Sequence, residues 1–133
     1  IAGHHPEPVR MDLMPRVTFC RPQIASVGMT EAEATEAGHT VKVGSFPFRA
    51  LGKATIVGEI DGFAKLVADA ETDILLGAHI IGPHAGDLLA EPVFARLVEG
   101  TAGEIAMSVH AHPTLTEVLA EAALAVDGAA IHV

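Results

Sequence analysis

The fold of this chain is decided by the stretch FAKLVADAETDILLGAHII, residues 63–81. It contains two apolar runs, residues 63–69 and 74–81, on either side of a polar segment, residues 70–73, that has the composition of a turn. The two runs therefore predict a β-hairpin. Because both runs are apolar on both faces, we expect the hairpin to lie at the centre of a sheet.

Upstream of the hairpin, the sequence predicts further strands. Short apolar runs at residues 17–20 and 24–27 and an alternating run at residues 40–48 have strand character, and Pro47 is expected to mark the edge or end of the last one. A weaker strand is expected at residues 55–57.

Helical patterns dominate the rest of the chain. Thr30 and Glu33 have the spacing of a capping box, which predicts a short acidic helix that stops at Gly38. Pro92 is expected to kink or split a longer helix after about residue 90. Strands followed by helices predict an α+β domain, an antiparallel sheet flanked by helices. The helices expected after the hairpin are residues 85–99, 102–107 and 115–127, the last ended by Gly128.

Length and composition limit the function classes. The 133 residues suffice for one domain, expected at residues 16–133 after an extended, proline-containing connector, residues 1–15, from an absent upstream region. Half of the residues are apolar, which suggests that some apolar surface is buried against a partner. The net charge of -9 argues against binding to nucleic acids or to anionic membranes.

Cys20 is the only cysteine, so the chain cannot form an internal disulfide, a redox dithiol or a cysteine-rich zinc site. We expect it to be buried as a small apolar residue. No apolar run approaches the length of a membrane span, and the start of the chain has no signal-peptide pattern. A cytoplasmic location is therefore expected.

The segment VHAHPTLTE, residues 109–117, carries the chemistry. Glu117 would lie in the first turn of a helix capped by Thr114, and helical side chains lean toward the N-terminus, so its carboxylate can reach His112. An imidazole oriented by a carboxylate is suited to proton transfer. The same residues also fit a capping box with no catalytic role, and the two interpretations can coexist.

A metal site is an alternative use of the histidines. Imidazoles two residues apart, as in His110-x-His112, share a face of an extended segment and could ligate zinc. The sequence supplies no matched third and fourth ligands, so no metal site is predicted. The other candidate ligands are His4, His5, His79 and His84.

Several motifs together resemble a known family. They are MPRVTF (residues 14–19), IASVGMTE (24–31), KVGSFPF (42–48), LGAHIIGP (76–83) and HAHPTLTE (110–117). In this order and spacing, they resemble the C-terminal dimerisation domain of the FAD-dependent pyridine nucleotide-disulfide oxidoreductases, and the dihydrolipoamide dehydrogenases most closely. The departures are Arg21 and Gln23, where the family carries an acidic residue, and Pro92.

The resemblance implies a role for each residue of the segment. His112 would be the general base and acid toward the dihydrolipoamide thiols, and Glu117 would orient its ring and stabilise the imidazolium. His110, Pro113 and Thr114 would support this pair, with His110 in packing or in a contact on the flavin side. The peptide bond between His112 and Pro113 is expected to be cis, as the sharp turn over the helix start requires.

The resemblance also implies partners and cofactors. The enzyme would be a homodimer whose subunits contribute the His112 side chain to each other's flavin and redox disulfide, with a lipoyl domain of a 2-oxoacid dehydrogenase complex as substrate. FAD and NAD would be bound by the full-length enzyme, and none is expected on this chain, which lacks a Gly-x-Gly-x-x-Gly motif and a cysteine pair. The alternatives are a glutathione- or mercuric-reductase-like enzyme and a non-catalytic dimeric interaction module.

Overall fold

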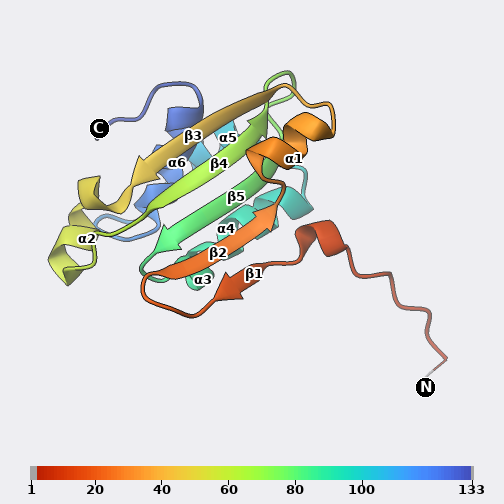
Figure 1. Ribbon diagram of the computed structural model, residues 1–133, viewed down its shortest axis with the longest axis horizontal. Coiled ribbons are helices and arrows are strands. Elements are labelled where there is room, and N and C mark those ends of the chain that lie inside the picture. The colour runs from red at the N-terminus through yellow and green to blue at the C-terminus, as the bar shows by residue number, and fades with distance from the viewer. Residues whose placement is uncertain (1–2, 133) are drawn as a thin grey trace.

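One antiparallel sheet organises the computed structural model, which describes residues 3–132 (Figure 1). The strand order is β1-β2-β5-β4-β3, and helices pack on the sheet, so the predicted α+β class is confirmed. The strands are β1 (Arg16–Thr18), β2 (Gln23–Gly28), β3 (Val41–Pro47), β4 (Phe63–Asp69) and β5 (Leu75–Gly82).

The predicted hairpin is β4 and β5, and it lies at the centre of the sheet as expected, with β3 beside β4 and β2 beside β5. Its turn is held by the Asp69 carboxylate, which accepts hydrogen bonds from the backbone N–H groups of Glu71 and Thr72. The His39 ring also contacts this carboxylate, at 2.7 Å. The hydrogen bond with His39, followed by those from the turn, lowers the pKa of Asp69 to about 2.

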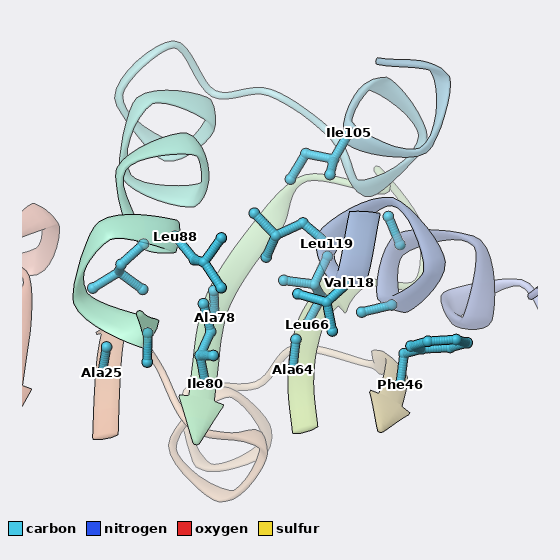
Figure 2. Packing of buried hydrophobic residues seen from close by; sticks show 14 of the residues in the cluster. Ala25, Phe46, Ala64, Leu66, Ala78, Ile80, Leu88, Ile105, Val118 and Leu119 are labelled. Atoms are coloured by element: carbon cyan, nitrogen blue, oxygen red, sulfur yellow. The ribbon is translucent and has the colours of Figure 1, made fainter. Parts of the chain in front are cut away.

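Four helices cover one face of the sheet and enclose the main core (Figure 2). Leu88, Ile105 and Leu119 come from three of these helices and project toward strand residues such as Ile80 and Leu66. The burial of this aliphatic surface is the main stabilising contribution to the fold. The helices are α3 (Ala85–Leu88), α4 (Ala90–Leu97), α5 (Ala102–Met107) and α6 (Glu117–Val126).

The opposite face is covered only in part. The predicted acidic helix is α1 (Glu31–Glu36), and its capping box between Thr30 and Glu33 is present. Its buried Ala34 packs on Val67 and Leu76 in a second, smaller cluster. The remaining elements are the 3₁₀ turns η1 (Met11–Leu13) and η2 (Phe48–Ala50) and the helix α2 (Gly52–Val57).

The close approach of α6 to the sheet depends on Gly44 in β3. A Cβ atom at this position would lie 2.1 Å from the carbonyl oxygen of Ala122 and 2.4 Å from the backbone nitrogen of Val126. No side chain fits there, because both neighbours are backbone atoms of the helix. Gly44 therefore allows α6, which begins at Glu117, to lie directly on β3.

The strand predicted at residues 55–57 is wrong, since these residues belong to α2. β3 and β4 pair with each other from Val41 and Asp69 to Pro47 and Phe63, so the chain between them has no strand partner. Its backbone groups are satisfied by local helical bonds instead, and the helix ends at Gly58, which adopts a left-handed conformation.

The helix predicted at residues 85–99 is split into α3 and α4 at Leu89, as the presence of Pro92 suggested. Pro92 is the third residue of α4, where the backbone N–H would have no partner within the helix. The proline therefore removes no hydrogen bond from α4. It is one of the most completely buried side chains of the domain.

Cys20 is exposed, so the prediction that it is buried is wrong. β1 ends at Thr18, and Cys20 lies in the turn to β2, outside the layers that enclose the core. Its Sγ atom lies 3.0 Å from the carbonyl oxygen of Pro22.

Residues 3–10 form no helix or strand, and η1 follows them. The Arg96 side chain of α4 holds η1 in place by donating a 2.6 Å hydrogen bond to the carbonyl oxygen of Asp12. The division into a connector and a domain stays a prediction. No helix within residues 3–132 has the length and apolarity needed to cross a membrane.

Candidate active site

His112 and Glu117 are in contact in the segment that joins α5 to α6. The ring Nδ1 of His112 lies 2.8 Å from Oε1 of Glu117, so the predicted contact between them is confirmed. Glu117 is the first residue of α6, and its side chain is 22% exposed. The His112 ring is 78% exposed. The pair thus joins a shielded carboxylate to an imidazole that solvent can reach.

The second oxygen of Glu117 is also used. Oε2 accepts a 2.8 Å hydrogen bond from the backbone N–H of Thr114. Burial acts to raise the pKa of Glu117, but the hydrogen bonds from Thr114 and His112 outweigh it, so the pKa lies below its ordinary value. Glu117 is therefore an ionised acceptor near neutral pH. The Nδ1 atom of His112 must donate to it, which leaves the Nε2 atom as the ring position facing solvent.

The prediction that Thr114 is the N-cap residue of the last helix is wrong. The N-cap residue of α6 is Thr116, without a side-chain cap bond, and the helix begins two residues later than expected. The hydroxyl of Thr114 instead donates a 2.7 Å hydrogen bond to the carbonyl oxygen of Ala111 and closes the loop. Half of the capping box remains, because Glu117 still binds the N–H of Thr114. One carboxylate thus serves as both cap and ring partner.

The peptide bond between His112 and Pro113 is cis, as predicted. The bond between Arg21 and Pro22 is also cis, which was not predicted from the sequence.

His110 faces the protein rather than solvent. Its Nε2 atom lies 3.0 and 3.1 Å from the two carboxylate oxygens of Glu91 in α4, and its Nδ1 atom lies 2.9 Å from the carbonyl oxygen of Ser108. The ring is only 9% exposed. His110 and His112 are only two residues apart in the chain, but their rings lie in different environments. The pairing with Glu91, 19 residues upstream, has no local signal in the sequence.

A further imidazole–carboxylate pair lies farther along α6, between Glu121 and His132. Glu121 is 5% exposed. Its Oε1 atom lies 2.6 Å from Nδ1 of His132, and its Oε2 atom accepts a 2.9 Å hydrogen bond from the N–H of Ile131. Burial acts to raise the pKa of Glu121, but these hydrogen bonds lower it overall. The sequence did not predict this contact, although Glu121, an acidic residue among the apolar residues of α6, is a signal that could have indicated it.

The remaining histidines considered for a metal site are dispersed. His79 bonds the carbonyl oxygen of Met29, His84 contacts Asp87, and His4 and His5 are exposed in the segment before η1. Within residues 3–132, no group of three or more His, Cys, Asp or Glu side chains is placed to hold a metal ion.

Two other features of the surface do not involve His112 or Glu117. A cleft of about 620 Å³ is bounded by the β1–β2 turn and the segments around Gly58 and Pro83, and none of the predicted site residues lines it. Several exposed apolar side chains lie on α4 and α5 and on the residues that follow these helices: Phe94, Leu97, Val98, Met107 and Val109.

Comparison with known protein families gives a match to the pyridine nucleotide-disulphide oxidoreductase dimerisation domain over residues 14–123. The dihydrolipoyl dehydrogenase of Bacillus subtilis is 50% identical over 131 residues, which cover 98% of this chain and 28% of that protein. The dihydrolipoyl dehydrogenase of Corynebacterium glutamicum is 52% identical over 118 residues, which cover 87% of this chain and 25% of that protein. The chain thus spans about a quarter of the length of these relatives.

Two solved structures have a similar fold over most of this chain. LpdA from Mycobacterium tuberculosis matches with a TM-score of 0.83 and 25% identity, over 91% of this chain and 26% of that one. The HOCl-induced flavoprotein disulfide reductase RclA from Escherichia coli matches with a TM-score of 0.79 and 24% identity, over 83% of this chain and 25% of that one, which supports the fold alone.

Proposed function

The chain belongs to the pyridine nucleotide-disulphide oxidoreductase dimerisation domain family, and from this we propose that it is the dimerisation domain of a dihydrolipoyl dehydrogenase. The whole enzyme would oxidise the dihydrolipoamide of a lipoyl domain with NAD. In this proposal, His112 and Glu117 form the acid/base pair that the domain supplies to the active site of the partner subunit.

The observation that carries the proposal is the geometry of His112. Its Nδ1 atom is held by an ionised carboxylate, and its Nε2 atom faces solvent with a free lone pair. A thiol must lose its proton before it can attack a disulfide, and Nε2 can accept that proton. Glu117 then stabilises the imidazolium that forms.

The redox step balances with a disulfide supplied outside this chain. The thiolate attacks one sulfur of the enzyme disulfide and forms a mixed disulfide, and the second dihydrolipoamide thiol then displaces the enzyme sulfur. Lipoamide leaves as the cyclic disulfide, while the enzyme disulfide becomes a dithiol. His112 accepts a thiol proton in the first half of this sequence and can return it to a leaving enzyme thiolate.

The cofactors belong elsewhere in the enzyme. Residues 3–132 form an antiparallel sheet without the parallel βαβ unit of a dinucleotide fold, so they do not fit FAD or NAD as a site of their own. The flavin would carry electrons from the enzyme dithiol to NAD when bound in the remainder of the enzyme. The exposed apolar side chains of Phe94, Leu97, Val98, Met107 and Val109 are available to such a dimer interface.

The test is the His112→Ala variant of the dehydrogenase polypeptide that contains this chain. We expect the rate of dihydrolipoamide oxidation to fall about 10²–10⁴-fold, because the general base is removed. Oxidation of NADH with an artificial electron acceptor is the control, and it should stay near wild type because it needs no thiol deprotonation. Thiol oxidation near the wild-type rate would contradict the catalytic proposal and leave Glu117 as a capping residue only.

A further inference from the structure

His110 is a largely buried titratable group that the proposed proton transfer does not use. It lies two residues before His112 in the same segment, but its ring is 9% exposed. Both ring nitrogens have partners, the Ser108 carbonyl oxygen at 2.9 Å and the Glu91 carboxylate at 3.0 Å. A ring so completely engaged is suited to fixing the backbone that carries it.

Both partners of the His110 ring are hydrogen-bond acceptors, a carbonyl oxygen and a carboxylate. A hydrogen bond to a carboxylate is stronger than one between neutral groups. The contact with Glu91 is therefore the stronger of the two that hold the ring.

This pair connects the His112 segment to a different helix. The other hydrogen bonds of residues 108–114 are local to α5, the segment itself and the start of α6. Among the hydrogen bonds within residues 3–132, the contact between Glu91 and His110 is the one that joins the segment to α4. Val109, next to His110, is exposed, and the His112 side chain is bonded to Glu117 of α6 and not to α4.

We propose that Glu91 is a positioning residue for His112: by holding the His110 ring, it fixes the segment that presents the His112 imidazole to its substrate. The inference rests on the proposed function and adds a residue from α4 to the site. Glu91 would not touch the substrate. Its removal would let the backbone at His112 shift, and shifts of about 1 Å in a catalytic group can cost about 100-fold in rate.

The experiment compares Glu91→Ala and Glu91→Gln in the assembled, flavin-loaded dehydrogenase. We expect Glu91→Ala to lower kcat for dihydrolipoamide about 10- to 100-fold, with NADH oxidation by an artificial acceptor within about twofold of wild type. Glu91→Gln keeps an acceptor for the ring and should recover most of the loss. The matched control is Glu36→Gln, which removes the same charge from an exposed position on α1 and should leave both rates unchanged.

A double variant separates positioning from a general structural defect. If Glu91 acts through His112, adding Glu91→Ala to His112→Ala should cause little further loss of thiol oxidation. Equal losses in thiol and acceptor activity, additive losses in the double variant, or a Glu91→Ala rate equal to that of Glu36→Gln would each overturn the inference.

The proposed function is tested separately by His112→Ala alone. A large effect of His112→Ala together with no effect of Glu91→Ala would overturn only the inference. Should Glu91→Ala fail to fold, His110→Gln removes the ring that Glu91 holds, and a folded His110→Gln variant with unaltered kcat for dihydrolipoamide would equally overturn it.

Discussion

The two histidines of the loop between α5 and α6 are held in opposite ways. In the downstream pair, the His112 ring is exposed and its partner Glu117 is largely shielded. In the upstream pair, the His110 ring is largely buried and its partner Glu91 is the more exposed member. An exposed ring can exchange a proton with a substrate, whereas a buried ring with both nitrogens engaged can only hold the chain in place. The same residue type thus serves two purposes within three residues.

The difference also concerns distance along the chain. Glu117 follows His112 by five residues and contacts it through local geometry, while Glu91 precedes His110 by 19 residues and belongs to another helix. The downstream pair depends on where α6 begins. The upstream pair depends on how α4 packs beside the loop. Variants that weaken each histidine–carboxylate pair separately can therefore test whether the two pairs are independent.

The largest effect, on stability, is expected from weakening the packing of α6, the helix that carries Glu117 of the downstream pair. Leu119 is fully buried on α6, two residues after Glu117. Leu119→Ala should lower the free energy of unfolding by about 2–5 kcal/mol, because it leaves a cavity under the helix. Chemical denaturation measures this change. Ile56→Ala, at an exposed position on α2, is the control and should stay within about 0.5 kcal/mol of wild type.

A smaller and more specific effect is expected from Glu117→Gln. The amide can still accept from Nδ1 of His112, but it lacks the charge that favours the imidazolium, so dihydrolipoamide oxidation should fall about 10-fold. Steady-state kinetics of the purified variant measures this change. An unchanged rate would show that Glu117 serves only the backbone N–H of Thr114.

The same variant has a consequence for stability. The pKa of Glu117 is lowered in the folded state, so the carboxylate contributes stability above its ordinary pKa and loses it as the pH falls through the folded value. Glu117→Gln should remove this part of the acid dependence, measured as the change of unfolding temperature between neutral and acidic pH.

The smallest effect on activity is expected from Asp69→Asn, in the β4–β5 turn. This carboxylate also pairs with an imidazole, that of His39, but in a structural turn. Its pKa of about 2 lies below the ordinary value of 3.8, so its stabilising contribution is present above that value and is lost as the pH falls through about 2. The variant should melt at a lower temperature near neutral pH and converge with wild type toward pH 2. Its rate of thiol oxidation should equal that of wild type. A clear loss of this rate would contradict the assignment of the Asp69–His39 pair to a structural role.

Sequence patterns predicted those parts of the structure that depend on near neighbours in the chain. The β4–β5 hairpin joins two apolar runs that follow each other directly in the chain. The capping box of α1 and the contact of His112 with Glu117 join residues three and five positions apart. The apolar runs on both faces of the hairpin also sufficed to place it at the centre of the sheet.

The parts that the sequence did not predict depend on contacts between distant segments. Residues 55–57 have strand character but no free strand beside them, so they became helical. Cys20 looked like a core residue, yet the turn between β1 and β2 places it at the surface. The contact of Glu91 with His110 arises only when α4 packs beside the loop. Periodicity carries no information about such contacts.

Gly44 has a consequence for genetics. Its hydrogen atom faces the backbone of α6, and any side chain there would push the helix away from β3. In a saturation mutagenesis screen scored on enzyme activity, position 44 should tolerate no other amino acid, although Gly44 carries no chemical group of its own. Alleles at this codon would be scored as catalytic defects, while their cause would be the displacement of the helix that carries Glu117.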